Sequence, residues 1–258
     1  MTKYNSSLQK AIDNLRARLP KTDPEVAHEP TIKDYGNCIP GCPICHGIGF
    51  VGKPDSMKAE VCPNKPISLA LTGLPESDWN ADWNHLIQTD AVRMMTKAIE
   101  ATLERGSGLL YFHGGYGIGK TVCLKAATIL AVKKRYQATY VRHSQMINHL
   151  RASNDARNKG LGTYEELLTN YSQVKFLAID ELGRSRETEF AAISFSDILD
   201  ARYEGAIAGN LITIIASNYA PEESLEPYQE DRIRDGRCQV VALEGVSMRA
   251  KITHTISN

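Results

Sequence analysis

Apolar positions from about residue 90 onward follow two alternating patterns. Recurrence every three or four residues predicts helices over Ala91–Glu104, over Lys120–Tyr136, within His143–Ser172 as one or two helices, and over Glu187–Tyr203. Short, nearly continuous apolar runs predict strands over Leu109–His113, Ala138–Arg142, Lys175–Ile179, Leu211–Ser217 and Gln239–Leu243. Apolar strands separated by helices are typical of a parallel sheet covered on both faces. The pattern therefore predicts an α/β fold in which a parallel sheet is sandwiched by helices.

The first 66 residues lack this alternation. Near the start, apolar residues recur at helical spacing up to Pro20, at Leu8, Ala11, Ile12, Leu15 and Leu19. The apolar face of this predicted helix either packs on the segment that follows or docks a partner protein, and both alternatives stay open. The polar, proline-containing stretch from Pro20 to Pro30 is typical of a linker.

The overall composition says more about where the protein is located than about what it does. The 258 residues carry 30 basic and 30 acidic side chains, so net charge neither favours nor excludes a nucleic-acid partner. The N-terminal stretch has no apolar core of a secretory signal, and the sequence has no apolar run of about 18 residues that would span a membrane. We therefore expect a cytoplasmic protein without a membrane partner, whose thiols stay reduced.

Four of the six cysteines lie close together with the spacing C-x3-C-x2-C-x16-C: Cys38, Cys42, Cys45 and Cys62. The segment Cys42–His46 also matches the C-x-x-C-H sequence of haem attachment, and its two cysteines could form a redox pair. Haem attachment normally accompanies export, and neither alternative uses the outer two cysteines, so the spacing favours a structural zinc site. His46 could replace Cys38 or Cys62 as a ligand. The remaining cysteines, Cys123 and Cys238, are expected to be small buried side chains.

A zinc site of this kind would have a structural role. A closed four-ligand site leaves no position for a reactive water. The intervening glycines, Gly41, Gly47 and Gly49, permit the tight turns that bring the thiolates together. Metal binding would stabilise a segment too short to form its own core, by roughly 10–16 kcal/mol at neutral pH.

The segment from Leu109 to Thr121, LLYFHGGYGIGKT, contains the phosphate-binding pattern G-x-x-x-x-G-K-T between a predicted strand and a predicted helix. Its glycines let backbone N–H groups face phosphates, and the helix adds the positive end of its dipole. We expect Lys120 to contact the β- and γ-phosphates and Thr121 to bind Mg²⁺. The expected nucleotide-binding residues are Gly114, Gly115, Tyr116, Gly117, Ile118, Gly119, Lys120 and Thr121.

Polar residues end two later strands. The run VKFLAIDELG places Asp180 and Glu181 at the carboxyl end of a strand, where open α/β sheets bind ligands. We expect Asp180 to hold Mg²⁺ and Glu181 to polarise the attacking water. The run LITIIASN ends in Asn218, whose amide could orient water near the γ-phosphate if its strand lies beside the phosphate-loop strand. The guanine-binding pattern N-K-x-D is absent, which favours ATP.

With these residues in place, the chain resembles an AAA+ ATPase. The segment Glu230–Arg249, EDRIRDGRCQVVALEGVSMR, resembles the terminal motif of the bacterial helicase-loader ATPases of DnaC and DnaI type and of their relative, the transposition helper ATPase IstB. The resemblance implies a P-loop AAA+ sheet, ATP and Mg²⁺ as ligands, and a homo-oligomer formed through the AAA+ domain. It also implies that Arg232 is an arginine finger for a neighbouring subunit's ATP and that Arg249 is a second nucleotide sensor. The chain departs from the family at Asp180–Gly183, where Asp-Glu-Leu-Gly replaces Asp-Asp-x-Gly.

The resemblance covers roughly residues 70–250 well and residues 1–66 in outline. DnaI-type loaders carry a zinc module that docks on the replicative helicase. The resemblance therefore implies an ATP-dependent loader of a replicative hexameric helicase onto single-stranded DNA. Its expected parts are an N-terminal helix and linker (1–30), a zinc-binding module (31–66), a connector (67–89) and an AAA+ ATPase domain (90–258).

Two further expectations complete this hypothesis. In the connector, Trp79 and Trp83 are expected to be packing anchors. The DNA surface is expected at Arg151, Arg157 and Lys159, because basic residues in this region could follow phosphates without reading sequence. Two alternatives remain. The first is an IstB-like transposition helper that acts on duplex DNA, and the second is a helicase-binding adaptor or inhibitor with little turnover.

Overall fold

The structure is a computed structural model that describes residues 38, 41–47, 49–52, 59–62, 64–65, 68–153, 162–183 and 188–249. The strands are β1 (Phe50–Gly52), β2 (Ala59–Val61), β3 (Gly108–Gly114), β4 (Ala138–Arg142), β5 (Phe176–Leu182), β6 (Ile212–Ser217) and β7 (Gln239–Leu243). The helices are α2 (Asp90–Arg105), α3 (Lys120–Lys133), α4 (His143–Ser153), α5 (Tyr164–Gln173), α6 (Glu189–Ile207), α7 (Pro221–Ser224) and α8 (Pro227–Arg234). Short 3-10 helices occupy Ala70–Thr72, Glu76–Asp78 and Trp83–His85. The predicted helix near residues 8–19 and the linker after it lie outside the described residues.

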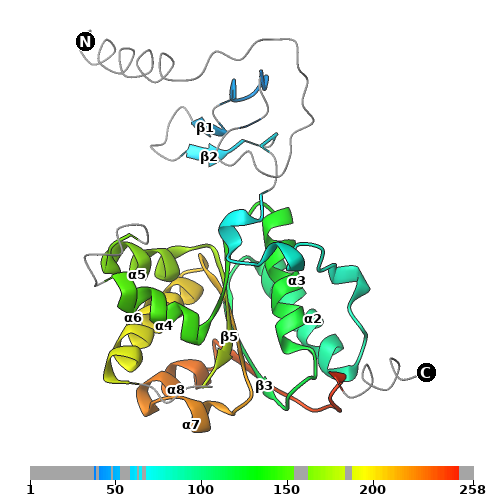
Figure 1. Cartoon of the computed structure of the whole chain (residues 1–258), viewed down its shortest axis with the longest axis vertical. Coiled ribbons are helices and arrows are strands. Elements are labelled where there is room, and N and C mark those ends of the chain that lie inside the picture. Colours follow the sequence, from blue (N-terminus) through cyan, green and yellow to red (C-terminus); the bar gives the residue numbers. More distant parts are fainter. Residues whose placement is uncertain are drawn as a thin grey trace.

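Five strands form one parallel sheet in the order β4–β5–β6–β3–β7. The prediction of a parallel sheet between helices is confirmed (Figure 1). The strand that leads to Asn218, β6, pairs directly with the phosphate-loop strand β3, as expected. Because all five strands run in the same direction, the carboxyl ends of β3, β5 and β6 meet at one edge of the sheet. The smaller β1–β2 pair is antiparallel and belongs to the cysteine segment.

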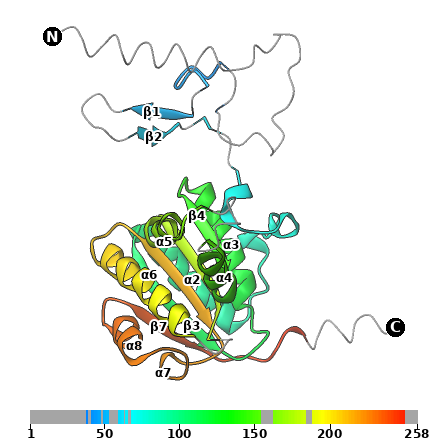
Figure 2. The same cartoon turned by 60° about the vertical axis from the view of Figure 1, so that its left-hand side comes forward.

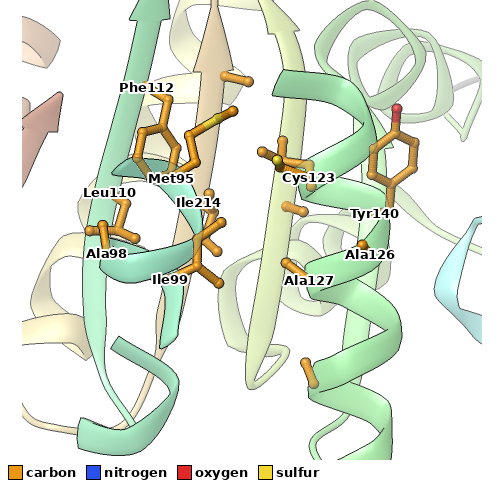
Figure 3. Packing of buried hydrophobic residues seen from close by; sticks show 14 of the residues in the cluster. Met95, Ala98, Ile99, Leu110, Phe112, Cys123, Ala126, Ala127, Tyr140 and Ile214 are labelled. Carbon is orange, nitrogen blue, oxygen red and sulfur yellow. The ribbon is translucent and has the colours of Figure 1, made fainter. Parts of the chain in front are cut away.

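Helices cover both faces of the sheet, with α2 and α3 on one face and α4, α5 and α6 on the other (Figures 1 and 2). The strands supply each face with alternate side chains, as the two-residue period requires. In β3, Leu110 and Phe112 pack toward α2 and α3, whereas Leu109 and Tyr111 pack toward the opposite layer. Figure 3 shows Leu110 and Phe112 against Met95 of α2. The core is therefore two apolar layers separated by the sheet.

The connector ahead of α2 packs on the first of these layers. Trp79 and Trp83 are partly buried against it, so the prediction that they are packing anchors is confirmed. The indole N–H of Trp79 donates to the carbonyl of Leu74 at 3.1 Å, and that of Trp83 donates to Glu100 at 2.8 Å. Each large apolar ring is thereby buried while its polar N–H keeps a partner.

Two differences from the predicted elements have local causes. The helix expected to reach Tyr136 ends at Lys133, because Arg135 adopts a left-handed φ of 67° that turns the chain into β4. The sequence analysis did not predict α8, which begins with Pro227 and is closed at its start by Gln229, whose side chain accepts from the backbone N–H of Glu226 at 3.1 Å. None of the described helices is both long enough and apolar enough to cross a membrane.

Candidate functional site

The phosphate-binding loop lies at the carboxyl edge of the sheet, between β3 and the start of α3. Gly114 and Gly117 have φ values of 150° and 76°. A Cβ atom on Gly114 would lie 2.2 Å from the carbonyl oxygen of Leu243, and one on Gly117 would lie 2.1 Å from Oγ of Ser247. Both glycines are therefore needed for two reasons: their φ values are positive, and the end of β7 and the segment after it pack directly against the loop.

Lys120 is the first residue of α3 and is only 8% exposed. Its Nζ donates to the carbonyls of Gly114 and Gly115 at 2.6 and 2.8 Å and to Oδ1 of Asn218 at 2.9 Å. Burial lowers the pKa of Lys120 to about 8, against the opposing effect of Asp180. A buried cation held by neutral oxygens fits an incoming phosphate, which would supply the missing negative charge.

The end of β5 carries a bulge at the two predicted acidic residues. Asp180 and Glu181 together lie opposite one residue of β6, Ala216. Glu181 has a φ of 58°, a region that residues with side chains seldom adopt. Bulges of this kind redirect side chains beside active sites. A regular strand would point these two consecutive carboxylates to opposite faces, whereas at this bulge both residues line one cavity.

Asp180 is buried, at 2% exposure, and both of its oxygens are held. The hydroxyl of Tyr140 donates to Oδ2 at 2.8 Å, and the backbone N–H of Glu181 donates to Oδ1 at 2.9 Å. Burial and the nearby Asp180 raise the pKa of Tyr140, so the phenol remains the donor. Glu181 is half-buried, with its Oε2 3.8 Å from Nε of Arg142. Tyr140 was not predicted as a site residue, since in sequence it is one apolar position of a strand.

A cavity of about 460 Å³ opens at this edge of the sheet, within the size range of small-molecule sites. The predicted residues that line it are Tyr116, Gly117, Gly119, Lys120, Thr121, Asp180, Glu181, Asn218 and Arg249. Sequence reasoning missed Ala216 and Ser217, at the end of β6, and three lining residues from other segments, Ile87, Val122 and Met248. An adjoining cavity of about 350 Å³ shares these three and continues toward His85. They carry no motif, and the connector and the chain after β7 place two of them there.

Four predicted residues do not line the cavity. Ile118 is 2% exposed and belongs to the core. Gly114 and Gly115 take part through the carbonyls that hold Lys120. Arg232 lies on α8, outside the cavity of its own chain.

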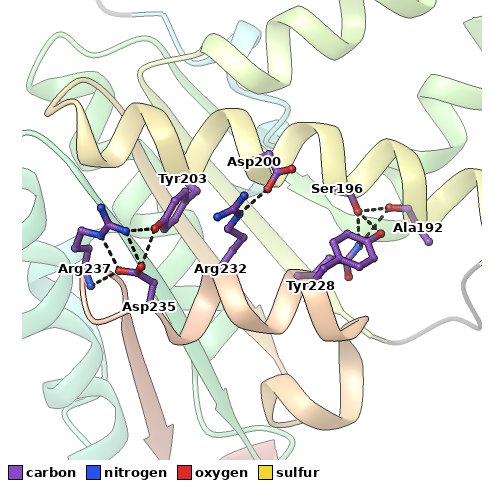
Figure 4. Close-up of polar contacts among 9 residues, drawn as sticks. Ala192, Ser196, Asp200, Tyr203, Tyr228, Arg232, Asp235 and Arg237 are labelled. Atoms are coloured by element: carbon purple, nitrogen blue, oxygen red, sulfur yellow. Dashed lines mark hydrogen bonds and ion pairs between the residues drawn. The ribbon is translucent and has the colours of Figure 1, made fainter.

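Arg232 is held on the outer face of α6 (Figure 4). Its Nε donates to Oδ1 of Asp200 at 3.0 Å, and its guanidinium lies 5.0 Å from the ring centre of Tyr203. Among the described residues, its terminal nitrogens Nη1 and Nη2 form no hydrogen bond, and the side chain is 43% exposed. The guanidinium therefore lies outside its own chain's nucleotide cavity and is partly exposed.

The predicted DNA surface is described only in part. Arg151, near the end of α4, lies 5.8 Å from the ring centre of Phe190 and donates to Oγ1 of Thr188 at 3.3 Å. It is exposed, with its charge at the surface. Arg157 and Lys159 lie outside the described residues.

The four predicted zinc ligands form one cluster. The Sγ atoms of Cys38, Cys42, Cys45 and Cys62 all lie within 4.8 Å of one another, and all four residues are buried. Cys42 and Cys62 are separated by 3.7 Å and Cys38 and Cys62 by 3.8 Å, and the cysteines form no disulfide. Four sulfurs about 2.3 Å from one zinc ion at tetrahedral angles would be about 3.8 Å apart. The cluster therefore fits a tetrahedral zinc ion. His46 is exposed and is not part of it.

Donors beside Cys42 and Cys45 favour the thiolate form that binds metal, whereas burial raises the pKa of Cys62. The backbone N–H of Gly49 donates to Sγ of Cys45 at 3.2 Å, and Nδ2 of Asn64 lies 3.5 Å from Sγ of Cys42. A hydrogen bond from the backbone of Cys45 is the main cause that lowers the pKa of Cys42 to about 6. Gly41 and Gly47 have positive φ values of 68° and 91°, which makes the turns between ligands possible.

The parallel sheet, the phosphate loop after β3, and an inserted strand between the loop strand and the strand bearing Asp180 define a P-loop ATPase domain of the AAA+ class. A profile of the family described as IstB-like ATP binding protein matches residues 74–255. The chain belongs to this family.

Two relatives place the chain beside different systems. The putative ATP-binding protein of insertion sequence IS232 from Bacillus thuringiensis subsp. berliner is 27% identical over 149 residues, or 55% of this chain and 56% of that protein. The replicative helicase loader DnaI of Bacillus subtilis (strain 168) is 25% identical over 130 residues, or 50% of this chain and 39% of that protein. The chain thus spans about half, or less, of the length of these curated relatives.

Solved structures share the fold. The crystal structure of DnaI superposes with a TM-score of 0.55 at 21% identity, covering 66% of this chain and 95% of that one. The crystal structure of the DnaC helicase loader gives 0.52 at 17% identity, covering 66% of this chain and 100% of that one. AMPPCP-bound DnaA from Aquifex aeolicus gives 0.54 at 23% identity, with coverages of 68% and 54%. At these identities, the likeness establishes the AAA+ fold.

Proposed function

We propose that this protein hydrolyses ATP to load a replicative hexameric DNA helicase onto single-stranded DNA. The observation that carries the proposal is the convergence of Lys120, Asp180, Glu181 and Asn218 on one cavity beside a glycine loop. The similarity to DnaI and the cysteine cluster ahead of the ATPase domain support the helicase partner.

In this proposal, each group at the cavity has a chemical task. Lys120 exchanges its carbonyl partners for the β- and γ-phosphates, and Glu181 orients the attacking water. Thr121 and Asp180 would hold Mg²⁺, which neutralises charge on the phosphate oxygens when bound. Asn218 now accepts from Lys120 and would be released toward water at the γ-phosphate. Arg249, which lines the same cavity, would sense the bound nucleotide.

The catalytic set is completed between subunits. Arg232 does not line its own chain's cavity, and its side chain is 43% exposed. A neighbouring copy in a homo-oligomer could therefore receive it as an arginine finger at the γ-phosphate. Such a finger is typically worth about 10³–10⁵ in rate. Hydrolysis would then depend on assembly.

The segment ahead of the ATPase domain would dock the helicase. We assign residues 31–66 to a zinc-binding module, residues 1–30 to a helix and linker, residues 67–89 to a connector and residues 90–258 to the AAA+ domain. Zinc would hold the four cysteines, whose sulfur separations fit it. Reduced cysteines of this kind suit the cytoplasm.

A second candidate function is an IstB-like transposition helper. The family match and the relative from insertion sequence IS232 favour it specifically. It would use the same ATP site but would act on duplex DNA with a transposase as partner.

A capture experiment separates these candidates. The full chain and a chain lacking residues 1–66 are each mixed with purified hexameric helicase, with and without ATP. Binding to single-stranded and duplex DNA is measured in parallel. Helicase capture by the full chain alone, with preference for single strands, supports the loader. Absence of capture together with duplex binding and transposase recruitment would replace it with the transposition helper.

A further inference from the structure

The hydroxyl of Tyr140 holds one oxygen of the Asp180 carboxylate, and no motif assigns this tyrosine a role. We propose that Tyr140 is a positioning residue that orients Asp180 toward the magnesium of bound Mg²⁺–ATP. The inference rests on the proposed ATPase function, because it concerns how the same site acquires its metal.

The contact is short, buried and complete. The hydroxyl lies 2.8 Å from Oδ2 of Asp180, with Tyr140 at 5% and Asp180 at 2% exposure. The other oxygen accepts from the backbone N–H of Glu181 at 2.9 Å. One donor on each oxygen fixes the plane of the carboxylate, while its remaining lone pairs stay available to a metal or to metal-bound water.

The sheet fixes the two residues relative to each other. Tyr140 of β4 pairs with Ala178 of β5, which lies two residues before Asp180. Residues two apart on a strand lie on the same face, so this register leads both side chains to the side of α3. The bulge that begins at Asp180 then brings its carboxylate to the phenol.

The phenol ring is almost completely buried in this position. Figure 3 shows it alongside α3, on the side of Ala126. Nζ of Lys125 lies 5.9 Å from the ring centre. On the backbone side, the connector approaches so closely that a Cβ atom on Gly73 would lie 2.5 Å from the carbonyl oxygen of Tyr140. The ring is nearly buried and its backbone is held by the connector, so it supports the carboxylate from a fixed strand position, while one side of Tyr140 lines a cavity of about 350 Å³ beside Lys125 and Arg142.

Removal of the hydroxyl alone should therefore disturb metal binding and leave phosphate binding intact. In Tyr140→Phe the ring still packs, but Asp180 loses one of two fixed donors. Losing an outer partner of a metal-binding carboxylate typically costs about 10–100-fold in metal affinity or activity. We expect the Mg²⁺ concentration for half-maximal effect to rise about 10-fold. Nucleotide binding in excess EDTA should not change, because none of the contacts of Lys120 involves Tyr140.

The full chain is titrated with a fluorescent ATP analogue in EDTA and then with Mg²⁺ at fixed nucleotide. Mn²⁺ binding to the protein–nucleotide complex is followed by electron paramagnetic resonance as a readout independent of turnover. The matched control is Tyr171→Phe. It removes the hydroxyl of another buried tyrosine, which is hydrogen-bonded to His149 at 3.0 Å. It belongs to the opposite core layer. Melting temperatures of both variants calibrate any general loss of stability.

A higher Mg²⁺ midpoint in Tyr140→Phe, with normal EDTA binding and an unaffected Tyr171→Phe, supports the inference. If Tyr140→Phe folds poorly, 4-fluorophenylalanine at position 140 restores the volume of the side chain without a hydrogen-bond donor. This variant should show the same higher Mg²⁺ midpoint and the same normal binding in EDTA. An unchanged Mg²⁺ midpoint beside a normal wild-type response would overturn the positioning role and leave the ATPase intact. A wild-type chain that shows no Mg²⁺-dependent nucleotide binding would instead remove the proposed ATPase function, and the inference with it.

Discussion

The cysteine cluster and the phosphate site each bring polar side chains to one point by different means. The four cysteines come from one short stretch, and their sulfurs lie within 4.8 Å of one another; among the described residues, Val51 is the partly buried apolar side chain that packs against them. The phosphate site takes residues from β5, from the ends of β3 and β6 and from the segment after β7, and two buried apolar layers hold these elements in place. We therefore expect the local cluster to depend on a bound ion for its stability and the sheet-based site not to.

Loss of the metal should have the largest effect of the changes considered, and it should unfold the cysteine segment without unfolding the ATPase domain. Cys42→Ser should lose zinc, and the cysteine segment should unfold, because metal binding supplies roughly 10–16 kcal/mol in such sites at neutral pH. The AAA+ domain should keep its melting temperature and nucleotide binding. Zinc content, limited proteolysis and hydrogen exchange over residues 41–65 measure this outcome.

Cys238→Ser is the matched control, since Cys238 is a half-buried cysteine outside the cluster. A cysteine segment that resists proteolysis equally in Cys42→Ser and wild type would show that no metal stabilises it. A lowered melting temperature of the ATPase domain in Cys42→Ser would show that the two regions are not independent.

The same contrast explains what could be predicted from sequence. The cysteine cluster was predictable because its members lie close together in sequence. The sheet was predictable because apolar strands alternate with helices, and the order of motifs then places Lys120, Asp180 and Asn218 at one edge. Family matching and structural likeness support that part.

What escaped prediction depends on contacts between distant segments. The bulge at Asp180 and Glu181 appears only when β5 is laid beside β6. Ile87 and Met248 reach the cavity because the connector and the chain after β7 return to the phosphate loop. Tyr140 is one apolar strand position in sequence, and its role depends on a partner 40 residues away. The roles given to Arg232 and Arg249 stay predictions.

In the proposed oligomer, residues from two copies of the chain meet at one ATP site. Removing the residue supplied by the neighbouring copy, Arg232, should have the next largest effect. In Arg232→Ala, ATP turnover should fall by about 10³-fold or more if the residue is a finger, while ATP binding stays the same. Turnover measured against protein concentration, with binding measured separately, checks this. Mixing Arg232→Ala with Lys120→Ala should restore part of the activity, because mixed neighbours recreate one intact site.

Arg237→Ala is the matched control for that experiment. Arg237 also lies over Tyr203, at 5.3 Å, and pairs with Asp235 close to α8. An equal loss in both variants would indicate disruption of the α6–α8 contact instead of a missing finger. Turnover of wild type that does not depend on concentration would count against assembly.

Acid should destabilise the ATPase domain through one buried histidine, independently of any metal. Burial lowers the pKa of His143, at the start of α4, from 6.5 to about 4. The unfolded chain takes up a proton near pH 6.5, but the folded chain does not until about pH 4. The free energy of unfolding therefore decreases as pH falls from 6.5 toward 4, by about 2 kcal/mol at pH 5.

Denaturant unfolding at pH 7 and pH 5 measures this loss of stability, and His143→Gln should reduce it. The exposed His85→Gln should retain the full loss, and identical pH profiles for wild type and His143→Gln would refute this assignment.

The smallest expected effect is on the affinity for DNA, to which a single exposed arginine would contribute. Arg151 presents its guanidinium at the surface beside Phe190 and carries no carboxylate partner among the described residues. If it contacts a backbone phosphate, Arg151→Ala should weaken single-stranded DNA binding modestly and lower the salt slope of log K by about 1. Fluorescence anisotropy from low to moderate salt gives that slope. Arg93→Ala is the control, because Arg93 is an exposed helical arginine that pairs with Asp90 on α2. Equal salt slopes for Arg151→Ala and wild type would show that the DNA surface does not include Arg151. Equal reductions of the slope in Arg151→Ala and Arg93→Ala would show that the arginine acts through the overall charge of the protein and not through a phosphate contact.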